Sequence, residues 1–211
     1  MEGLKGTMHA ALGAGAGFIT ANSLQSDPSA TMFLVTVGGI AGLLPDVDVD
    51  GKLSNKITFS YKLIRTVAQL IGFLMILYSF LEGSSSEKWI GIIIGAGMMI
   101  ISSFLTQRRM LTVTGIGVLA GGLSLHESWL ILLGIYIIVA SFISHRSYTH
   151  TLIGMLFFAA IALRFEQSIG VEGTFAACMG AYASHLIADM KILPFNKRGV
   201  KYFLPISKKE F

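Results

Sequence analysis

The chain has 211 residues, of which 53% are hydrophobic and only 13% are charged. Soluble globular domains carry about 25% charged residues, so a soluble fold of this length would lack the polar surface to cover its apolar residues. The mean hydropathy of +0.69 points the same way. Composition therefore excludes an ordinary soluble domain and predicts an integral membrane protein.

The net charge of +4 does not indicate a nucleic-acid partner. The basic residues lie in short segments between apolar runs, which is the pattern that orients membrane helices. Cys178 is the single cysteine, so a disulfide framework and a cysteine-based zinc site are both excluded. The first apolar stretch follows Lys5 and resembles a signal peptide. His9 at its start and the apolar runs that follow favour a helix that is retained in the mature protein.

Apolar runs separated by polar residues occur eight times, and they predict an all-α, polytopic transmembrane helical bundle of about eight spans. A span needs about 20 residues, with about 17 as the lower limit, and several runs are near that limit. The 110–144 region could instead form one broken hairpin around His126 and Glu127. The eight runs cover approximately residues 8–25, 30–45, 63–81, 89–106, 110–125, 128–144, 151–165 and 172–189.

Lysine and arginine set the expected orientation, since they concentrate on the cytoplasmic side of membrane proteins. If eight spans alternate from a cytoplasmic N-terminus, 14 of the 16 Lys and Arg residues fall on the cytoplasmic side, and only Lys88 and Arg164 fall opposite. This distribution predicts that both termini are cytoplasmic.

On this map, four of the five histidines and several aspartates gather at the cytoplasmic ends of the helices, although they are spread along the whole sequence. The orientation count did not use these residues, so their convergence is independent information. Asp50 reads as an ordinary solvated loop acid. The remaining seven are His9, Asp46, Asp48, His145, His150, His185 and Asp189.

Local spacing strengthens part of this cluster. His185 and Asp189 stand at i and i+4, so they share one helical face. Both side chains can then reach one metal ion, or the carboxylate can orient the imidazole. The alternative is a simple hydrogen bond between the two side chains at the end of the helix. Pro45 ends the second run and lets Asp46 and Asp48 fold toward one point. His145 and His150 are five apart, so their segment must turn for both to meet one site.

Glycines at helical spacing accompany the polar residues. Gly13 and Gly17 follow His9 at i+4 and i+8, and Gly38 and Gly42 repeat the spacing on the second run. Small residues four apart allow close helix contact in lipid. The helices that carry polar groups are therefore also expected to pack tightly.

Ionisable groups at membrane depth are costly and default to functional hypotheses. Imidazole and carboxylate together suit zinc, iron or manganese. Seven candidate ligands exceed what one tetrahedral ion takes, which favours a two-metal site whose ions activate water and stabilise a phosphoryl or acyl oxyanion. Arg146, Lys52 and Lys56 in the same layer favour a phosphoester as substrate.

These motifs resemble those of the bacterial membrane-bound metal-dependent hydrolase family that includes YdjM. The resemblance is carried by His9, the Leu-Pro-Asp-Val-Asp run at 44–48, His-Arg-x-x-Thr-His at 145–150 and Ser-His-Leu-Ile-Ala-Asp at 184–189. It covers roughly residues 1–60 and 144–211, and residues 61–143 are helices inserted into this motif-bearing core of a single membrane domain. His9 follows Thr7-Met8, where the family pattern places Thr directly before His.

Carried over residue by residue, the resemblance implies that the seven residues above form the metal site, in likeness to helical zinc-dependent phospholipases C. We expect a multi-pass protein of the bacterial cytoplasmic membrane that binds one to three divalent ions, zinc being favoured over Mn or Fe. The expected reaction is hydrolysis of a phospholipid or other lipid-linked phosphoester. We assign the catalytic roles to Asp48, Arg146 and His150, with Arg146 neutralising the phosphate.

Two other functions remain open on the sequence. An ion- or proton-coupled transporter also uses intramembrane His and Asp, although carrier sites lie near the bilayer midplane and these residues lie at helix ends. A non-catalytic scaffold with a structural metal would be expected to use cysteine, which this cluster lacks.

Overall fold

The structure is a computed structural model that describes residues 6–47, 61–82, 85–143, 147–191, 199–207 and 209–210. Within these ranges the fold is all-α, as predicted, and contains no strand. The chain divides into two compact units. The first comprises Met1–Ser54 with Leu111–Phe211, and the second comprises Asn55–Met110.

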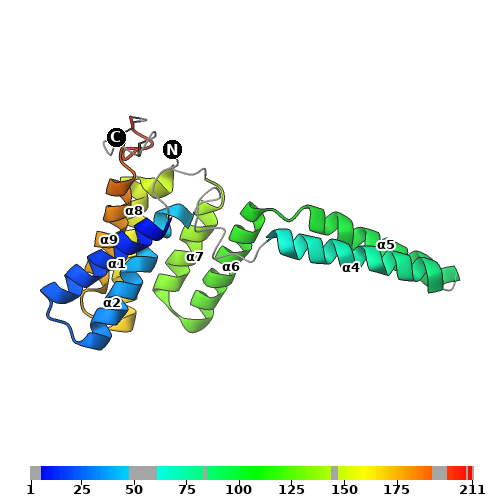
Figure 1. The fold of residues 1–211 in the computed structure, drawn as a ribbon, viewed down its shortest axis with the longest axis horizontal. Helices are drawn as coiled ribbons and strands as arrows, with labels where there is room; N and C mark the ends of the chain where they lie inside the picture. The colour runs from blue at the N-terminus through cyan, green and yellow to red at the C-terminus, as the bar shows by residue number, and fades with distance from the viewer. Residues whose placement is uncertain are drawn as a thin grey trace. The chain divides into compact units, whose positions relative to one another are not determined.

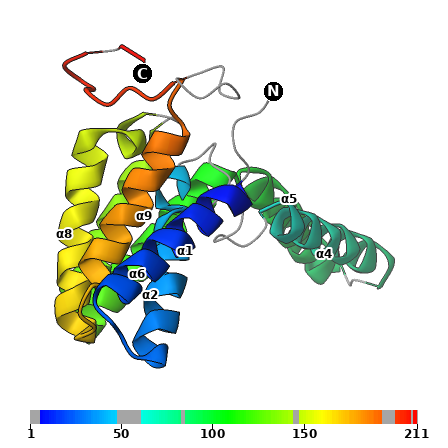
Figure 2. The same ribbon diagram turned by 60° about the vertical axis from the view of Figure 1, so that its left-hand side comes forward.

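The first unit is built from six α-helices and two short 3₁₀ helices (Figure 1). α1 packs on α2 and α9, and α8 packs on α9 (Figure 2). α8 also packs on α7, and α2 also contacts α9. The elements are α1 (Gly6–Ser23), α2 (Pro28–Ala41), η1 (Leu44–Val47), α6 (Gln107–Leu125), α7 (Ser128–Ala140), η2 (Tyr148–His150), α8 (Leu152–Ile169) and α9 (Thr174–Ala188).

Local sequence explains where these helices start and stop. Asp27 caps α2, accepting hydrogen bonds from the backbone N–H of Ser29 and Ala30, and Pro28 occupies the first helical position. Thr151 caps α8 in the same way, accepting from Gly154 N at 3.2 Å. α8 ends at Gly170, whose φ of 73° is left-handed. The cap at Thr151 fixes the chain immediately after His150.

Glycine brings α1 and α2 into backbone contact, as the small-residue spacing predicts. A Cβ on Gly42 would stand 2.6 Å from the carbonyl oxygen of His9, and one on Gly13 would collide with the carbonyl oxygen of Gly38. A side chain at either position would force the helices apart. The close approach holds the first turn of α1 beside the C-terminal end of α2.

The second unit is a pair of helices, α4 (Tyr61–Glu82) and α5 (Ser85–Ser103), that pack along each other. A Cβ on Gly72 would stand 2.7 Å from the carbonyl oxygen of Gly95, so glycine again permits the close contact. The Lys88 ammonium lies 4.1 Å from the centre of the Phe80 ring. The predicted inserted region, 61–143, thus divides between the two units, because α6 and α7 lie mainly in the first.

The eight predicted apolar runs coincide with eight α-helices among the described residues, but the expectation of eight spans is wrong. Among the residues that the structure describes, two segments are long and apolar enough to cross a membrane, Ile64–Leu81 of α4 and all of α8. The number rises to three if α5 and α6 form one bent span. α2, α7 and α9 have 14, 13 and 15 residues, which at 1.5 Å per residue fall well short of an apolar core about 30 Å thick. The cytoplasmic placement of both termini relied on eight alternating spans and stays a prediction.

Candidate metal centre

Five titratable residues that are far apart in the sequence lie together in the first unit. His9 is in the first turn of α1, Asp46 is in η1, His150 ends η2, and His185 and Asp189 stand at the C-terminal end of α9. None of the five is more than 4% exposed to solvent. The convergence follows from the packing of α1, α2, α8 and α9, which brings these helix ends to one place.

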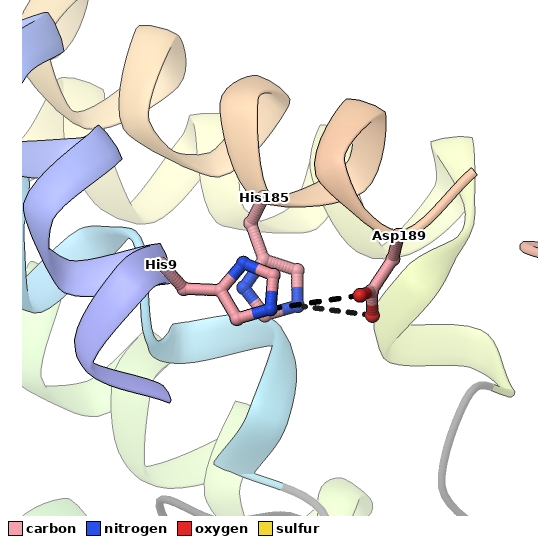
Figure 3. Close-up of side chains that lie close together, drawn as sticks. All are labelled: His9, His185 and Asp189. Atoms are coloured by element: carbon pink, nitrogen blue, oxygen red, sulfur yellow. Dashed lines mark ion pairs between the residues drawn. The ribbon is translucent and has the colours of Figure 1, made fainter. Parts of the chain in front are cut away.

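The α9 pair forms one half of the cluster. Nε2 of His185 lies 3.7 Å from Oδ2 of Asp189, one helical turn along the same face. Nε2 of His9 lies 3.5 Å from Oδ1 of the same carboxylate. The His9 and His185 rings stack, with centroids 3.9 Å apart, so both imidazoles point toward Asp189 (Figure 3).

Asp46, His150 and His185 form the other half. Nε2 of His150 lies 3.6 Å from Oδ1 of Asp46 and 3.3 Å from Nε2 of His185. Nε2 of His185 lies 3.7 Å from the same Asp46 oxygen. His150 is also 3.6 Å from Oδ2 of Asp189, so the two halves are continuous. His185 belongs to both groups of residues able to hold a metal ion.

The tautomer of His185 is fixed by one hydrogen bond. Its Nδ1 lies 2.7 Å from the carbonyl oxygen of Gly42, and because a carbonyl oxygen only accepts, Nδ1 carries the hydrogen. Nε2 of the neutral ring therefore presents a lone pair to the cluster. The groups around that nitrogen are the carboxylates of Asp46 and Asp189, which are also electron-pair donors, and the ring of His150.

The donor set fits a divalent cation. Two carboxylates and neutral imidazoles carry two negative charges in a buried pocket, which one divalent ion would balance. Ligands about 2.1 Å from a tetrahedral zinc ion lie about 3.4 Å from each other. Six of the separations between donor atoms here run from 3.3 to 3.7 Å, and within each of the two groups the ligand atoms lie within 4.8 Å of one another. An imidazole that donates its other N–H to a backbone carbonyl is also the usual arrangement of a metal-binding histidine.

His150 is held by a second layer of polar groups. Its Nδ1 lies 3.1 Å from the hydroxyl of Thr149. The hydroxyl of Tyr182, on α9, donates to the carbonyl oxygen of Thr149 and lies 3.1 Å from the hydroxyl of Tyr136. Tyr182 is fully buried and stacks on Phe158. This network fixes the turn that presents His150.

The chain after α9 returns to the same region. The hydroxyl of Tyr202 donates to the carbonyl oxygen of Leu186 at 2.9 Å, and the backbone N–H of Leu152 donates to the carbonyl oxygen of Tyr202 at 3.1 Å. Burial raises the pKa of the Tyr202 phenol, and the nearby Asp189 carboxylate raises it further. The C-terminal segment thus ties the end of α9 to the start of α8.

The structure brings together five of the seven predicted ligands. Asp48 and His145, and with them Arg146, Lys52 and Lys56, lie outside the described residues. His126, the fifth histidine, sits between α6 and α7 with a φ of 57° and is exposed, apart from the candidate cluster.

Sequence reasoning missed the second layer. Gly42 acts through its carbonyl oxygen, and a backbone acceptor leaves no trace in the residue type. Tyr182 precedes His185 by three residues and so shares its helical face, which was an available signal. Thr149 lies within the quoted 145–150 motif but was not singled out.

His9 adds a buried polar atom to the site. Its Nε2 faces Asp189, while its Nδ1 has no hydrogen-bond partner among the residues that the structure describes. In either tautomer, the edge of the His9 ring faces the Asp189 carboxylate (Figure 3). His9 thus packs on His185 and belongs to one of the two groups of described residues that could hold a metal ion.

Comparison with known proteins places the chain in a family. No curated protein and no solved structure matches the chain. A family match runs over residues 4–211 and includes residues 61–143, which the motifs alone left outside the resemblance. The family is described as the YdjM inner membrane protein. The chain belongs to the YdjM inner membrane protein family, and its place is the inner membrane.

Proposed function

We propose that this protein is a membrane-bound metal-dependent hydrolase that cleaves the phosphoester of a phospholipid or of another lipid-linked phosphate at the cytoplasmic face. The observation that carries the proposal is the lone pair of His185 Nε2, which faces two carboxylates and a second imidazole inside a buried pocket. A cation is the natural occupant of such a pocket.

A bound divalent ion would supply Lewis-acid activation of water and of a phosphoryl oxygen. The residues that would hold it are His9, Asp46, His150, His185 and Asp189, and we propose that Asp48 and His145 join them. Without that positive charge, two carboxylates would repel an anionic phosphate. The acidic pocket therefore supports phosphate chemistry only together with a metal.

The other roles in the proposed reaction fall to the protein's own residues. His185 is held by Gly42 and His150 by Thr149, so both rings are oriented before substrate arrives. His150 has one nitrogen facing the cluster and can serve as ligand or as proton acceptor, but not as both at once. We assign it as a ligand and keep Asp48 as the proton acceptor, with Arg146 as the phosphate-binding side chain.

The test is hydrolysis by the purified protein in detergent. Phosphatidylglycerol, phosphatidylethanolamine and a polyprenyl pyrophosphate are offered separately, and released phosphorylated headgroup or inorganic phosphate is measured with and without a chelator. We expect chelator-sensitive turnover that is lost in Asp46→Asn. Asp27→Asn, which changes an exposed helix cap, is the matched control and should retain turnover.

Two results would overturn the proposal. One is an absence of turnover on every lipid by protein that carries stoichiometric metal. The other is metal-dependent solute or proton uptake into liposomes with no lipid cleaved, which would favour a transporter.

A further inference from the structure

An apolar groove lies in the first unit beside the candidate metal centre. Its volume is about 250 Å³, and no charged side chain lines it. Ala41, Ala162 and Cys178 are buried in its floor together with Phe158, and the three small side chains leave the hollow. The other lining residues are Val37 and Ile40 on α2, Leu44 at the start of η1, Trp129 and Leu133 on α7, and Ile161 and Phe165 on α8.

Two residues that line the groove adjoin segments that carry the metal centre. Ala41 and Leu44 flank Leu43 and Gly42, whose carbonyl oxygen accepts the hydrogen bond from His185. Leu44 also begins η1, the short helix that carries Asp46. The lining is therefore one residue from Gly42 and two residues from Asp46 along the chain.

Two aromatic rings that pack on each other also line the groove. Trp129, at the start of α7, packs on Phe165 with ring centroids 4.7 Å apart. Along α8 the groove extends from Phe158 to Phe165, seven residues or about 10 Å. The part of α8 that lines the groove is thus about two helical turns long.

The groove is continuous with the surface that meets lipid. Ile40 on its wall is 59% exposed and stands on α2 with the exposed Met32, as expected for a helix of an inner membrane protein that faces acyl chains. An entirely apolar wall cannot solvate a charged or polar group. The volume is below the roughly 300–1,000 Å³ of sites for drug-sized ligands, so it suits one slim chain and not a head group.

We propose that the groove binds one acyl chain of a glycerophospholipid whose phosphate lies at the metal centre. The inference rests on the proposed function and deepens it, because it names the lipid part that the protein recognises. An unbranched acyl chain fits the groove better than a methyl-branched polyprenyl chain. Binding of the chain brings the phosphoester to the cluster by proximity.

Trp129 supplies a direct readout. The chain has two tryptophans, so Trp89→Phe leaves Trp129 as the only one. This variant in dodecyl maltoside is titrated with phosphatidylglycerol that carries bromine on one acyl chain, because bromine quenches tryptophan on contact. We expect saturable quenching, strongest with bromine deep in the chain, and relieved by unbrominated phosphatidylglycerol.

A filled groove provides the matched comparison. In the Trp89→Phe background, Ala162→Phe places a ring in the floor, whereas Ala160→Phe places the same ring on the exposed side of the same helix. Ala162→Phe should weaken the apparent affinity roughly tenfold or more, which is the effect of losing about two buried methylene groups. Ala160→Phe should leave it unchanged. Thermal unfolding and metal content report whether Ala162→Phe has folded, and the dependence on bromine depth needs no groove variant.

Quenching that never saturates, that ignores bromine depth, or that is equal in the two alanine variants would overturn the proposal. Stronger competition by a polyprenyl phosphate than by phosphatidylglycerol would overturn the choice of chain. Saturable quenching without hydrolysis would leave the groove standing and count against the proposed function alone. Hydrolysis without saturable quenching would support the proposed function and overturn the proposal that the groove binds an acyl chain.

Discussion

Nδ1 of His185 donates a hydrogen bond of 2.7 Å to the carbonyl oxygen of Gly42. The same glycine lies where any side chain would strike the carbonyl oxygen of His9. Gly42 therefore couples the close packing of α1 and α2 to the orientation of the imidazole at the centre of the cluster.

Gly42→Ala should damage both packing and metal binding. Its Cβ would stand 2.6 Å from a backbone oxygen, so α2 must shift, at about 1–3 kcal/mol for an overpacked contact. The shift also moves the acceptor that holds His185. We expect a lower thermal midpoint and a lower metal content, measured on the purified protein in detergent.

Gly15→Ala is the control for that change. Gly15 lies on α1, and a methyl group added there would have no neighbour within 4 Å. Ala is also better than Gly in a helix by roughly 0.5–1 kcal/mol. This variant should therefore keep its metal and unfold at the same or a higher temperature. Equal behaviour of the two alanine variants would show that the close approach at Gly42 is unimportant.

The helices could be predicted from the sequence, whereas the number of spans could not. Hydropathy marks where apolar helices lie, and the eight runs became eight helices. It does not show where a helix ends against a polar turn. α2 ends before η1 and α9 ends at Asp189, because there the chain turns to present side chains to the cluster, and both helices are left too short to span.

Part of the candidate site could also be predicted from the sequence, and part could not. Residues four apart on a helix lie on the same face, so the spacing of His185 and Asp189 alone predicts that their side chains are close. The structure shows both side chains in one cluster. The meeting of His9 with α9 needed tertiary packing through glycines on α1 and α2. The Gly42 carbonyl could not be found from residue types, since every residue has one.

His185→Ala should abolish most metal binding, because this ring is the one shared by both groups of potential ligands. The measurement is metal per protein after purification, by elemental analysis. His126→Ala removes a histidine that lies apart from the candidate cluster and should retain the metal. Unchanged metal content in His185→Ala would contradict the assignment of the centre.

Removal of the metal should destabilise the protein. A ligand that binds only the folded state stabilises it by about 2.7 kcal/mol when its free concentration is 100 times its Kd. Chelator should therefore lower the thermal midpoint, and added zinc should restore it. In Asp189→Asn the chelator effect should be much smaller, because a carboxylate that faces all three histidines is gone. An equal chelator effect in this variant would place the stabilising ion elsewhere.

Tyr182→Phe tests whether the second layer positions His150. The substitution keeps the ring that stacks on Phe158 and removes only the hydroxyl that donates to the Thr149 carbonyl oxygen and lies 3.1 Å from Tyr136. Loss of such an orienting contact weakens metal binding by roughly 10–100-fold, and a buried hydrogen bond lost costs about 1–3 kcal/mol. We therefore expect a higher metal Kd, measured by competition with a chromogenic chelator, together with a lower thermal midpoint. Tyr78→Phe, on the exposed surface of α4, should change neither quantity. A Tyr182→Phe protein that unfolds earlier but binds metal with wild-type affinity would show that Tyr182 serves the core and that His150 is held by other contacts.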